Sequence, residues 1–245
     1  RDYRTHYLQR AANVEIYIDS EMTAADVLEC GFQHVCVATG ATWRDDGVGR
    51  SSYTPLVLDA DAVCGVEVLM VGDAPRCDGP VVVFDDEHFY LGAVVAERMR
   101  ELCDDVTLVT SANEVSPFTT VTLEQHRVQA RVLDLGIRVV TAERVISLVD
   151  GILTTEANYG GYRRQHPCAL LVPVTACMPN EALFNALVER NADWADAGVQ
   201  SVVRIGDCVA PSAIEAAVFA GHRYARELGE PAPVVARDRP HIAGD

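Results

Sequence analysis

The hydrophobic pattern of this chain alternates between short apolar runs and longer segments with helical periodicity, as in an α/β protein. The clearest example is Val81–Arg98, in which the apolar run Val81–Phe84 leads into a turn and then an apolar-periodic helix, Tyr90–Leu102. This is the plan of the first βα unit of a dinucleotide-binding fold. A second predicted strand, Val106–Thr110, follows the helix. We therefore predict an α/β fold built from Rossmann-like units.

Apolar runs elsewhere continue this alternation of strands and helices. Further strands are predicted for Val14–Ile18, His34–Gly40, Ile137–Val140, Arg144–Val149, Ile152–Glu156, Ala169–Val174 and Val199–Ile205. Further helices are predicted for Tyr3–Ala12, Ala24–Cys30, Leu123–Leu135, Glu181–Glu189 and Ser212–Leu228. Loops are predicted for Ala41–Tyr53 and Ala157–His166, and the turn-forming run Gly72–Pro80 is predicted to link two domains. The pair Asp150-Gly151 predicts a tight hairpin.

The turn before the helix Tyr90–Leu102 lacks the chemistry of a nucleotide site. A dinucleotide-binding fingerprint has glycines where this turn has Asp85, Glu87 and Tyr90, because a pyrophosphate approaches bare backbone there. Two carboxylates at these positions would repel a pyrophosphate in a partly dry cleft. The next strand ends in a threonine and Ser111 instead of the acid or arginine that would bind the ribose. We therefore do not expect this unit to bind NAD(P)H.

The strongest local signal for a ligand is the run Val203–Pro211, just before the last predicted helix. An apolar strand delivers Gly206 and Asp207 to the start of that helix, which places a carboxylate beside free N–H groups. This arrangement suits ribose or ribitol hydroxyls and a neighbouring phosphate. The strand that ends at Thr39 and Gly40 has a similar tip, where glycine lets another group approach the backbone. These four residues are candidates for binding a nucleotide; the alternative for Asp207 is that it only caps the turn.

Composition excludes several classes of function. The chain has 245 residues, of which 49% are hydrophobic, so it can bury a large core. It holds 36 acidic and 20 basic residues, for a net charge of −16, and each of the 20 is an arginine. Such a surface repels nucleic acid and anionic membranes, so neither is an expected partner. A Schiff-base mechanism is excluded within this chain, since it holds no lysine.

The eight cysteines show no CxxC pair of the kind that zinc and iron–sulfur sites use. Most fall in apolar runs, as Cys36 does, which favours buried free thiols and a reducing, cytoplasmic location. No apolar run approaches the roughly 20 residues of a membrane helix, and the N-terminus has no signal-peptide pattern. Because the chain starts at Arg1, within a predicted helix, we expect it to be part of a longer polypeptide.

Several stretches of the sequence resemble one family of enzymes. They read RDYR at the start, TAADVLECG leading to VATGATW, FDDEHFYLGAVVAERM, TLEQHRVQARVLDLG, and RIGDCVAPSAIEAAVFAGHRYARE. Together they resemble the C-terminal portion of the trimethylamine dehydrogenase family, which includes the dimethylamine and histamine dehydrogenases and is related to 2,4-dienoyl-CoA reductase. The similarity extends to about Leu228, and the last stretch is its most specific part.

The resemblance implies two nested Rossmann-like domains of the disulfide-reductase type. An FAD/ADP-like domain would comprise residues 1–70 and 179–228, a degenerate NAD(P)-like domain would be inserted as residues 76–176, and residues 229–245 would form a C-terminal arm. Family members carry an FMN-bearing TIM barrel with a [4Fe–4S] cluster upstream of these domains, so the catalytic residues would lie outside this chain. The lost glycines in the turn match the amine dehydrogenase branch of the family, not the reductase branch.

By resemblance, this chain would be the structural, ADP-binding (or FAD-binding) region of an amine dehydrogenase, with Thr39, Gly40, Gly206 and Asp207 at the nucleotide site. Its partners would be the upstream barrel, an electron-transferring flavoprotein as electron acceptor, and a second copy in a homodimer. Two alternatives are open: a non-catalytic scaffold whose sites are both vestigial, and an NAD(P)H-dependent flavin oxidoreductase of the 2,4-dienoyl-CoA reductase type. The sequence does not identify the amine.

Overall fold

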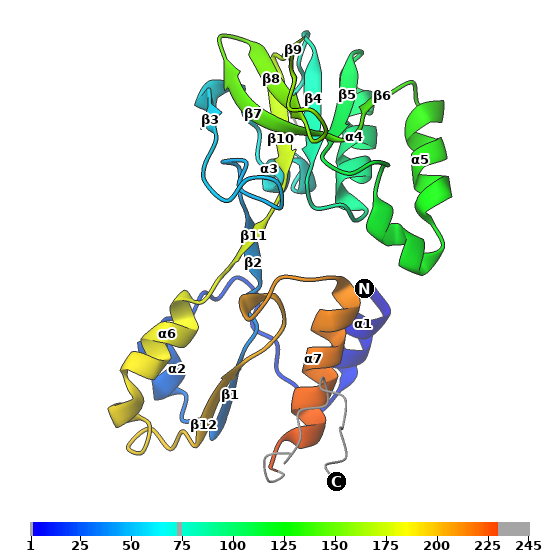
Figure 1. Cartoon of the computed structure of the whole chain (residues 1–245). Helices are drawn as coiled ribbons and strands as arrows, with labels where there is room; N and C mark the ends of the chain where they lie inside the picture. The colour runs from blue at the N-terminus through cyan, green and yellow to red at the C-terminus, as the bar shows by residue number, and fades with distance from the viewer. Residues whose placement is uncertain (1, 73–74, 230–245) are drawn as a thin grey trace, which may run out of the picture. The chain divides into compact units, whose positions relative to one another are not determined.

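The computed structural model describes residues 2–72 and 75–229, which form two compact units (Figure 1). The first unit comprises residues 2–40 and 180–229, and the second comprises the described residues between 41 and 179. Each unit is an α/β structure with parallel strand pairing. The predicted fold class, two nested units of Rossmann type, is confirmed.

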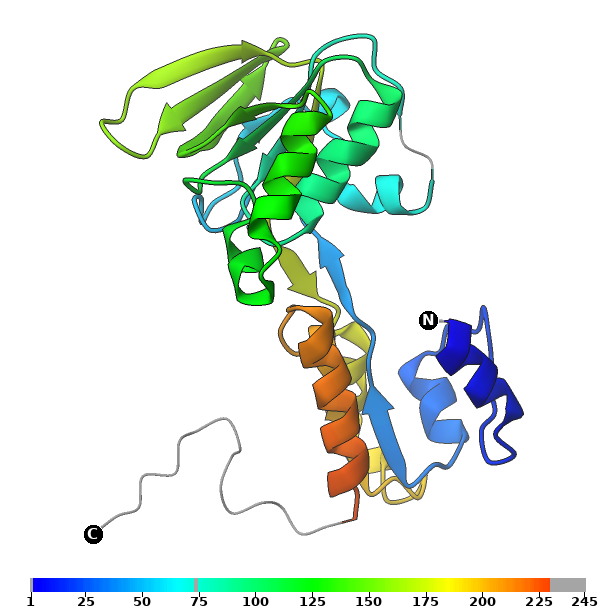
Figure 2. The same cartoon turned by 90° about the vertical axis from the view of Figure 1, so that its right-hand side faces the viewer.

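The second unit is built on a four-stranded parallel sheet. Its strands, in sheet order, are β10 (Leu170–Val174), β4 (Val81–Asp85), β5 (Val106–Thr110) and β6 (Arg138–Val140). The helix α4 (Leu91–Leu102) follows β4, and the helix α5 (Gln125–Asp134) precedes β6. The two helices lie side by side, as Figure 2 shows. The strands and helices predicted here from the hydrophobic pattern are thus confirmed, with boundaries that differ by a few residues.

The strand β4 packs against a different layer with each of its two faces. Val81 and Val83 belong to a core shared with α4, α5 and the short helix α3 (Val66–Met70). Val82 and Phe84 belong to a second core, which they share with a second, mixed sheet on the other side. Alternate side chains of a strand point to opposite faces, so an apolar run without polar positions is what a strand between two layers requires. Burying each such side chain stabilises the fold by roughly 1.5–3 kcal/mol.

The second sheet is mixed and consists of β3 (Val57–Leu58), β7 (Glu143–Val149), β8 (Ile152–Ala157) and β9 (Arg163–Pro167), in that order. β3 pairs parallel with β7, while β7, β8 and β9 are antiparallel. The predicted hairpin between β7 and β8 is confirmed, and its central residues have φ of 50° and 73°, as type I′ geometry requires. The prediction of a loop over Ala157–His166 is wrong at its second half, where β9 pairs with β8. The strand was not predicted because its residues are charged. Arg163 bonds to Glu156 of the adjacent strand β8, and Arg164 bonds to Glu143 of β7.

The first unit holds one parallel strand pair and four α-helices among the described residues. These elements are α1 (Asp2–Arg10), α2 (Ala24–Glu29), β1 (His34–Val37), α6 (Ala182–Glu189), β12 (Ser201–Arg204) and α7 (Ile214–Glu227). Thr23 caps α2 in a reciprocal capping box with Asp26. The core lies between α2, α6 and the two strands and includes Val37 and Leu187. The predicted strand Val14–Ile18 is wrong: all five residues are exposed and pair with no strand.

The chain passes between the units at residues 40–41 and 179–180, not at the predicted linker. On the side of the second unit, β2 (Ala41–Trp43) pairs antiparallel with β11 (Cys177–Pro179), so the predicted loop after residue 40 begins with a strand. Residues 41–70, predicted to belong with the first domain, fall in the second unit because β3 pairs with β7 and α3 packs on the central sheet. Apart from Gly229, the predicted C-terminal arm lies outside the described residues.

Two properties of the described residues concern the wider predictions from composition. No helix within them is long and apolar enough to cross a membrane. Four cysteines are buried, at positions 64, 103, 168 and 208, while Cys30 is exposed and the others are half-buried. The expectation of buried free thiols is thus confirmed for four of the eight cysteines and is wrong for Cys30.

Candidate functional site

The turn after β12 is shaped by glycine and held in place by a buried thiol. Gly206 has φ of +66°, a conformation that side chains with a Cβ rarely adopt, and it turns the chain out of the strand. The Cys208 thiol is fully buried and donates to the carbonyl oxygens of Val37 and Ile205 at 3.3 and 3.1 Å. The turn is therefore fixed to the end of β1, with Asp207 on its outer side.

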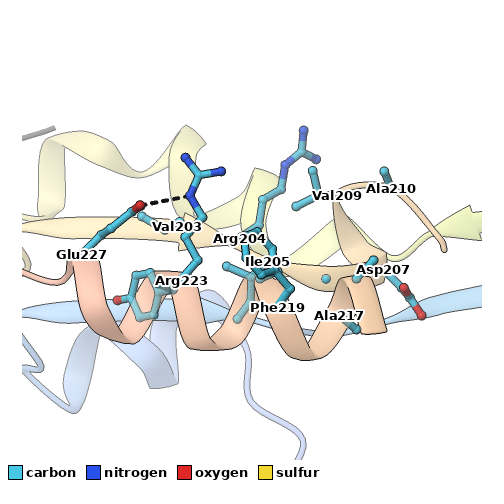
Figure 3. Close-up of a pocket in the computed structure, with 14 residues that line it drawn as sticks. Val203, Arg204, Ile205, Asp207, Val209, Ala210, Ala217, Phe219, Arg223 and Glu227 are labelled. Atoms are coloured by element: carbon cyan, nitrogen blue, oxygen red, sulfur yellow. Dashed lines mark hydrogen bonds and ion pairs between the residues drawn. The ribbon is translucent and has the colours of Figure 1, made fainter. Parts of the chain in front are cut away.

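A pocket of about 510 Å³ runs along the groove between this turn, β12 and α7 (Figure 3). Its lining is mostly apolar and includes Gly206, Asp207, Ile205, Ala217, Phe219 and Tyr224. Two arginines on its wall already have partners, since Arg204 pairs with Glu181 and Arg223 bonds to Glu227 at 3.1 Å. The volume lies within the range of about 300–1,000 Å³ that small-molecule sites occupy.

Polar groups lie at one end of this pocket, near the start of α7 (Figure 3). One carboxylate oxygen of Asp207, Oδ1, accepts a 3.3 Å hydrogen bond from the backbone N–H of Ser212. Ala213, the residue just before α7, has no side chain that could cap the helix. The N–H groups of the first turn are therefore not bonded by a capping side chain. A carboxylate beside the positive end of a helix can accept ribose hydroxyls while the helix favours a phosphate.

The structure does not bring all four predicted nucleotide-binding residues together. Gly206 and Asp207 line the pocket, but Thr39 and Gly40 do not. The Thr39 hydroxyl donates to the carbonyl oxygen of Asn180 at 2.6 Å, and the carbonyl oxygen of Gly40 accepts from the N–H of Asn180 at 2.9 Å. With φ of +73° at Gly40, these two residues shape the point where the chain leaves the first unit.

The acidic turn between β4 and α4 points its first two carboxylates into the second unit. Asp85 and Asp86 are fully buried. Asp85 Oδ1 accepts from the N–H of His88 at 2.9 Å, whereas Asp85 Oδ2 has no hydrogen-bond partner. Burial raises the pKa of Asp85 to about 7, helped by the neighbouring carboxylates and opposed by the backbone bonds it accepts. Burial also raises the pKa of Glu87, whose Oε2 accepts from the N–H of Phe89 at 2.8 Å.

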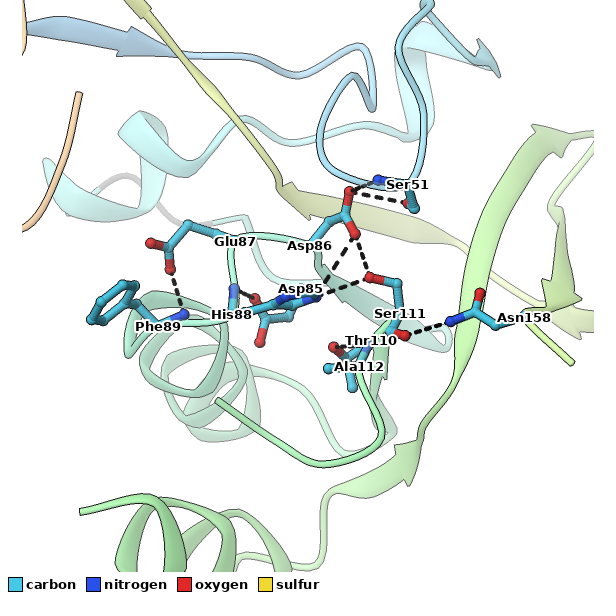
Figure 4. A network of polar contacts seen from close by, with 10 residues as sticks. All are labelled: Ser51, Asp85, Asp86, Glu87, His88, Phe89, Thr110, Ser111, Ala112 and Asn158. Carbon is cyan, nitrogen blue, oxygen red and sulfur yellow. Dashed lines mark hydrogen bonds and ion pairs between the residues drawn. The ribbon is translucent and has the colours of Figure 1, made fainter. Parts of the chain in front are cut away.

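Asp86 organises residues from three separate parts of the chain (Figure 4). Its Oδ2 accepts from the N–H and the hydroxyl of Ser51 at 2.8 and 3.0 Å. Its Oδ1 accepts a short hydrogen bond from the hydroxyl of Ser111, the residue that follows β5. Asn158, after β8, donates its amide to the Ser111 carbonyl oxygen at 2.6 Å. The carboxylate thus joins the ends of β4 and β5 to the loop that contains Ser51.

His88 completes this network in its neutral form. Its Nε2 lies 2.9 Å from the Ser111 hydroxyl, which already donates to Asp86, so Nε2 carries the proton and donates. Burial lowers the pKa of His88, against the raising effect of Asp86. The residue has φ of +74°, a left-handed conformation that is uncommon outside glycine. Hydrogen bonds therefore run from imidazole to hydroxyl to carboxylate, and the strained backbone is held by its neighbours.

The interior of the turn is filled by its own side chains. A Cβ placed at Gly92, in the first turn of α4, would lie 2.4–2.7 Å from the Asp85 side chain. The position where a pyrophosphate would meet a helix N-terminus is therefore occupied by the Asp85 carboxyl group. Sequence reasoning expected charge repulsion by this turn but missed the link to Ser51. No local pattern predicts that link, because Ser51 lies in a loop 35 residues upstream.

The contact between Gly92 and Asp85 leads to a paired prediction. Gly92→Ala should lower the free energy of unfolding by about 1–3 kcal/mol, since the added methyl group overpacks a buried site. The matched change Gly221→Ala, also within a helix, meets nothing within 4 Å and should be neutral or raise stability by up to about 1 kcal/mol. Denaturant unfolding measures both. Equal effects of the two changes would contradict the close packing at Gly92.

The described residues offer no metal centre, since no group of three or more His, Cys, Asp or Glu side chains within residues 2–72 and 75–229 could hold a metal ion.

Comparison with known proteins identifies relatives among amine-oxidising enzymes. No family model matches the chain. Dimethylamine dehydrogenase from Hyphomicrobium sp. (strain x) is 28% identical over 258 residues, which cover 95% of this chain and 35% of that protein. Histamine dehydrogenase from Rhizobium sp. 4-9 has a TM-score of 0.90 and 40% identity, covering 100% of this chain and 36% of that chain. The 6-hydroxypseudooxynicotine amine oxidase from Pseudomonas geniculata N1 has a TM-score of 0.87 and 33% identity, covering 93% of this chain and 34% of that chain.

The chain thus spans about a third of the length of these relatives. Among more distant structures, thioredoxin reductase from T. acidophilum has a TM-score of 0.54 and 16% identity over 79% of this chain. A likeness at that level of identity concerns the fold alone, and it agrees with two nested units of the disulfide-reductase type.

Proposed function

This chain is related along its whole length to the dimethylamine and histamine dehydrogenases, and on that premise we propose that it is the C-terminal nucleotide-domain region of an amine dehydrogenase. The whole enzyme would remove two electrons from a small amine by oxidative N-dealkylation or deamination and pass them to a flavoprotein acceptor. FMN and a [4Fe–4S] cluster would be held by the remaining part of the polypeptide. This chain would bind ADP and stabilise the assembly without a catalytic residue of its own.

One observation carries the proposal: the 40% identity to histamine dehydrogenase extends over all of this chain, with a TM-score of 0.90. The acidic turn supports the dehydrogenase over the reductase alternative. A reductase of the 2,4-dienoyl-CoA type would need NADPH at the end of β4, where buried Asp85 and Asp86 fill the turn. The scaffold alternative has no comparable support, since Gly206 and Asp207 line a pocket of suitable size and polarity for a nucleotide.

The experiment uses the full-length protein with its cofactors. Histamine, dimethylamine and a panel of other small amines are mixed anaerobically with the enzyme, and reduction of the flavin is followed by its visible absorbance. We expect at least one amine to reduce the flavin and NADPH not to do so. Rapid reduction by NADPH would instead support the reductase alternative. A purified protein without flavin, and without response to any amine, would support the scaffold.

Binding of ADP is a separate prediction about the pocket beside α7. Asp207→Ala should weaken ADP binding at least tenfold, or about 1.4 kcal/mol, because the carboxylate that would accept ribose hydroxyls is lost. Asp193→Ala is the control, since that carboxylate is exposed and pairs with Arg190 on the same unit. Calorimetry on protein freed of bound nucleotide measures the affinities. Unchanged ADP affinity in Asp207→Ala would exclude this residue from the site.

A further inference from the structure

A second pocket, of about 460 Å³, lies in the other unit next to the Asp86 network. It is lined by Arg50, Ser51, Ser111, Arg144, Glu156, Ala157, Asn158 and Gly161. Ser111 follows β5, so the pocket borders the carboxyl end of the parallel sheet, where ligands of open α/β sheets bind. The amine dehydrogenase function proposed above makes no use of it.

Two arginines and one carboxylate line this pocket. Among the described residues no carboxylate lies within ion-pair distance of Arg50, whose guanidinium stacks over the Phe118 ring, 4.7 Å from its centre. Arg144 bonds through Nη2 to Glu156 at 2.5 Å and through Nη1 to the Ser51 carbonyl oxygen at 3.3 Å. These contacts engage only part of its five N–H donors. Glu156 offsets the charge of Arg144, so Arg50 supplies the net positive charge of this lining, in a chain whose net charge is −16. Guanidinium groups with N–H donors left over are suited to binding an anion.

The other polar groups of the pocket present acceptors. The hydroxyl hydrogens of Ser51 and Ser111 are both directed to Asp86, so these oxygens can only accept from a ligand. The Asn158 amide donates to the Ser111 carbonyl oxygen, which leaves its own side-chain oxygen as a further acceptor. Acceptors of this kind match hydroxyl groups, while the arginines match a phosphate.

We propose that this pocket binds a small phosphomonoester that carries hydroxyl groups, such as a sugar phosphate. Arg50 and Arg144 bind the phosphate, and oxygens of Ser111 and Asn158 accept hydrogen bonds from hydroxyl groups of the ligand. Asp86 acts as a positioning residue because it holds Ser51 and Ser111 at the pocket. The site differs from a dinucleotide site, since the pyrophosphate position at the start of α4 is filled by the Asp85 side chain.

The test is calorimetric titration of the full-length protein with ribose 5-phosphate, inorganic phosphate and ribose, at an ionic strength held constant with chloride. We expect ribose 5-phosphate to bind at least tenfold more tightly than inorganic phosphate, and ribose not to bind. Arg50→Gln should weaken ribose 5-phosphate at least tenfold. Arg98→Gln, which removes a guanidinium from the exposed side of α4, should leave the affinity unchanged.

Three results would overturn the proposal. They are equal affinity in the Arg50→Gln and Arg98→Gln proteins, equal affinity for phosphate and ribose 5-phosphate, and no binding of ribose 5-phosphate at millimolar concentration. Arg50 is exposed and makes no ion pair among the described residues. Its replacement removes the stacking on Phe118 and an attraction to Glu87, so it should lower the unfolding free energy by no more than about 1 kcal/mol and leave the protein folded. Asp207→Ala alters only the ADP pocket and should not affect the affinity for ribose 5-phosphate. The proposals for the two pockets can therefore be contradicted independently of each other.

Discussion

Replacing Asp85 with asparagine should stabilise the protein at pH 8 by about 1–3 kcal/mol. The wild-type carboxyl is fully buried, its Oδ2 has no partner, and burial raises its pKa to about 7. At pH 8 the native state must therefore hold a poorly solvated charge. A shift from near 4 to about 7 corresponds to roughly 4 kcal/mol, from which the cost of burying an unpaired amide of about 1–3 kcal/mol is subtracted.

The sign of this effect should depend on pH. Between about pH 4, where an unfolded aspartate titrates, and about pH 7, the native state binds more protons than the unfolded state. The contribution of Asp85 to the unfolding free energy is thus present at low pH and lost as pH rises towards 7. Asp85→Asn should remove this dependence, so it should be neutral or mildly destabilising at pH 5 and stabilising at pH 8.

Denaturant unfolding of both proteins across this range measures the effect. Asp104→Asn is the control, because that side chain is fully exposed and its neutralisation should give differences within about 0.5 kcal/mol at both pH values. A loss of stability in Asp85→Asn at pH 8 would mean that the buried carboxylate is stabilised by its surroundings when charged.

The neighbouring residue should respond in the opposite way. Asp86→Ala should lower the unfolding free energy by about 3–5 kcal/mol, because a buried acceptor with three hydrogen bonds is removed and the half-buried donors of Ser51 and Ser111 lose their partner. The loop that carries Ser51 should loosen, which hydrogen exchange would detect as lost protection of the Ser51 amide.

A suitable control for this change is Asp105→Ala, since Asp105 is half-exposed and pairs with Arg138 on the surface at 3.2 Å. Its cost should stay below about 1 kcal/mol. A loss of less than about 1 kcal/mol in Asp86→Ala would show that the network of Figure 4 contributes little to stability.

The central sheet was predictable because its strands are buried on both faces. Runs such as Val81–Phe84 have no polar position, and this pattern has few interpretations once helices follow in alternation. The strand Arg163–Pro167 was missed because it is an exposed strand whose arginines are held by cross-strand glutamates. The strand predicted for Val14–Ile18 was wrong for the converse reason, because this segment alternates like a strand but pairs with no other strand. Alternation reports which face a residue would take, not whether a neighbouring strand exists.

The resemblance to the amine dehydrogenases was predictable from five short stretches of the sequence, and it is confirmed by the histamine dehydrogenase structure. The candidate site was predicted only in part. Gly206 and Asp207 are adjacent in sequence and share one turn, so a local motif could place them at one pocket. Thr39 was proposed by analogy with that strand end, but its hydroxyl is engaged by Asn180, a contact 141 residues apart in sequence.

The turn after β4, which is filled by its own side chains, affects how the stability of this unit depends on the concentration of nucleotides. A domain that needs a bound dinucleotide to hold its strand ends together gains stability with ligand concentration, as RT ln(1 + [L]/Kd). Here the Asp86 carboxylate, Ser51 and Ser111 are covalently part of the chain, so their effective concentration is fixed. We therefore expect the folded state of this unit not to depend on the concentration of nicotinamide nucleotides.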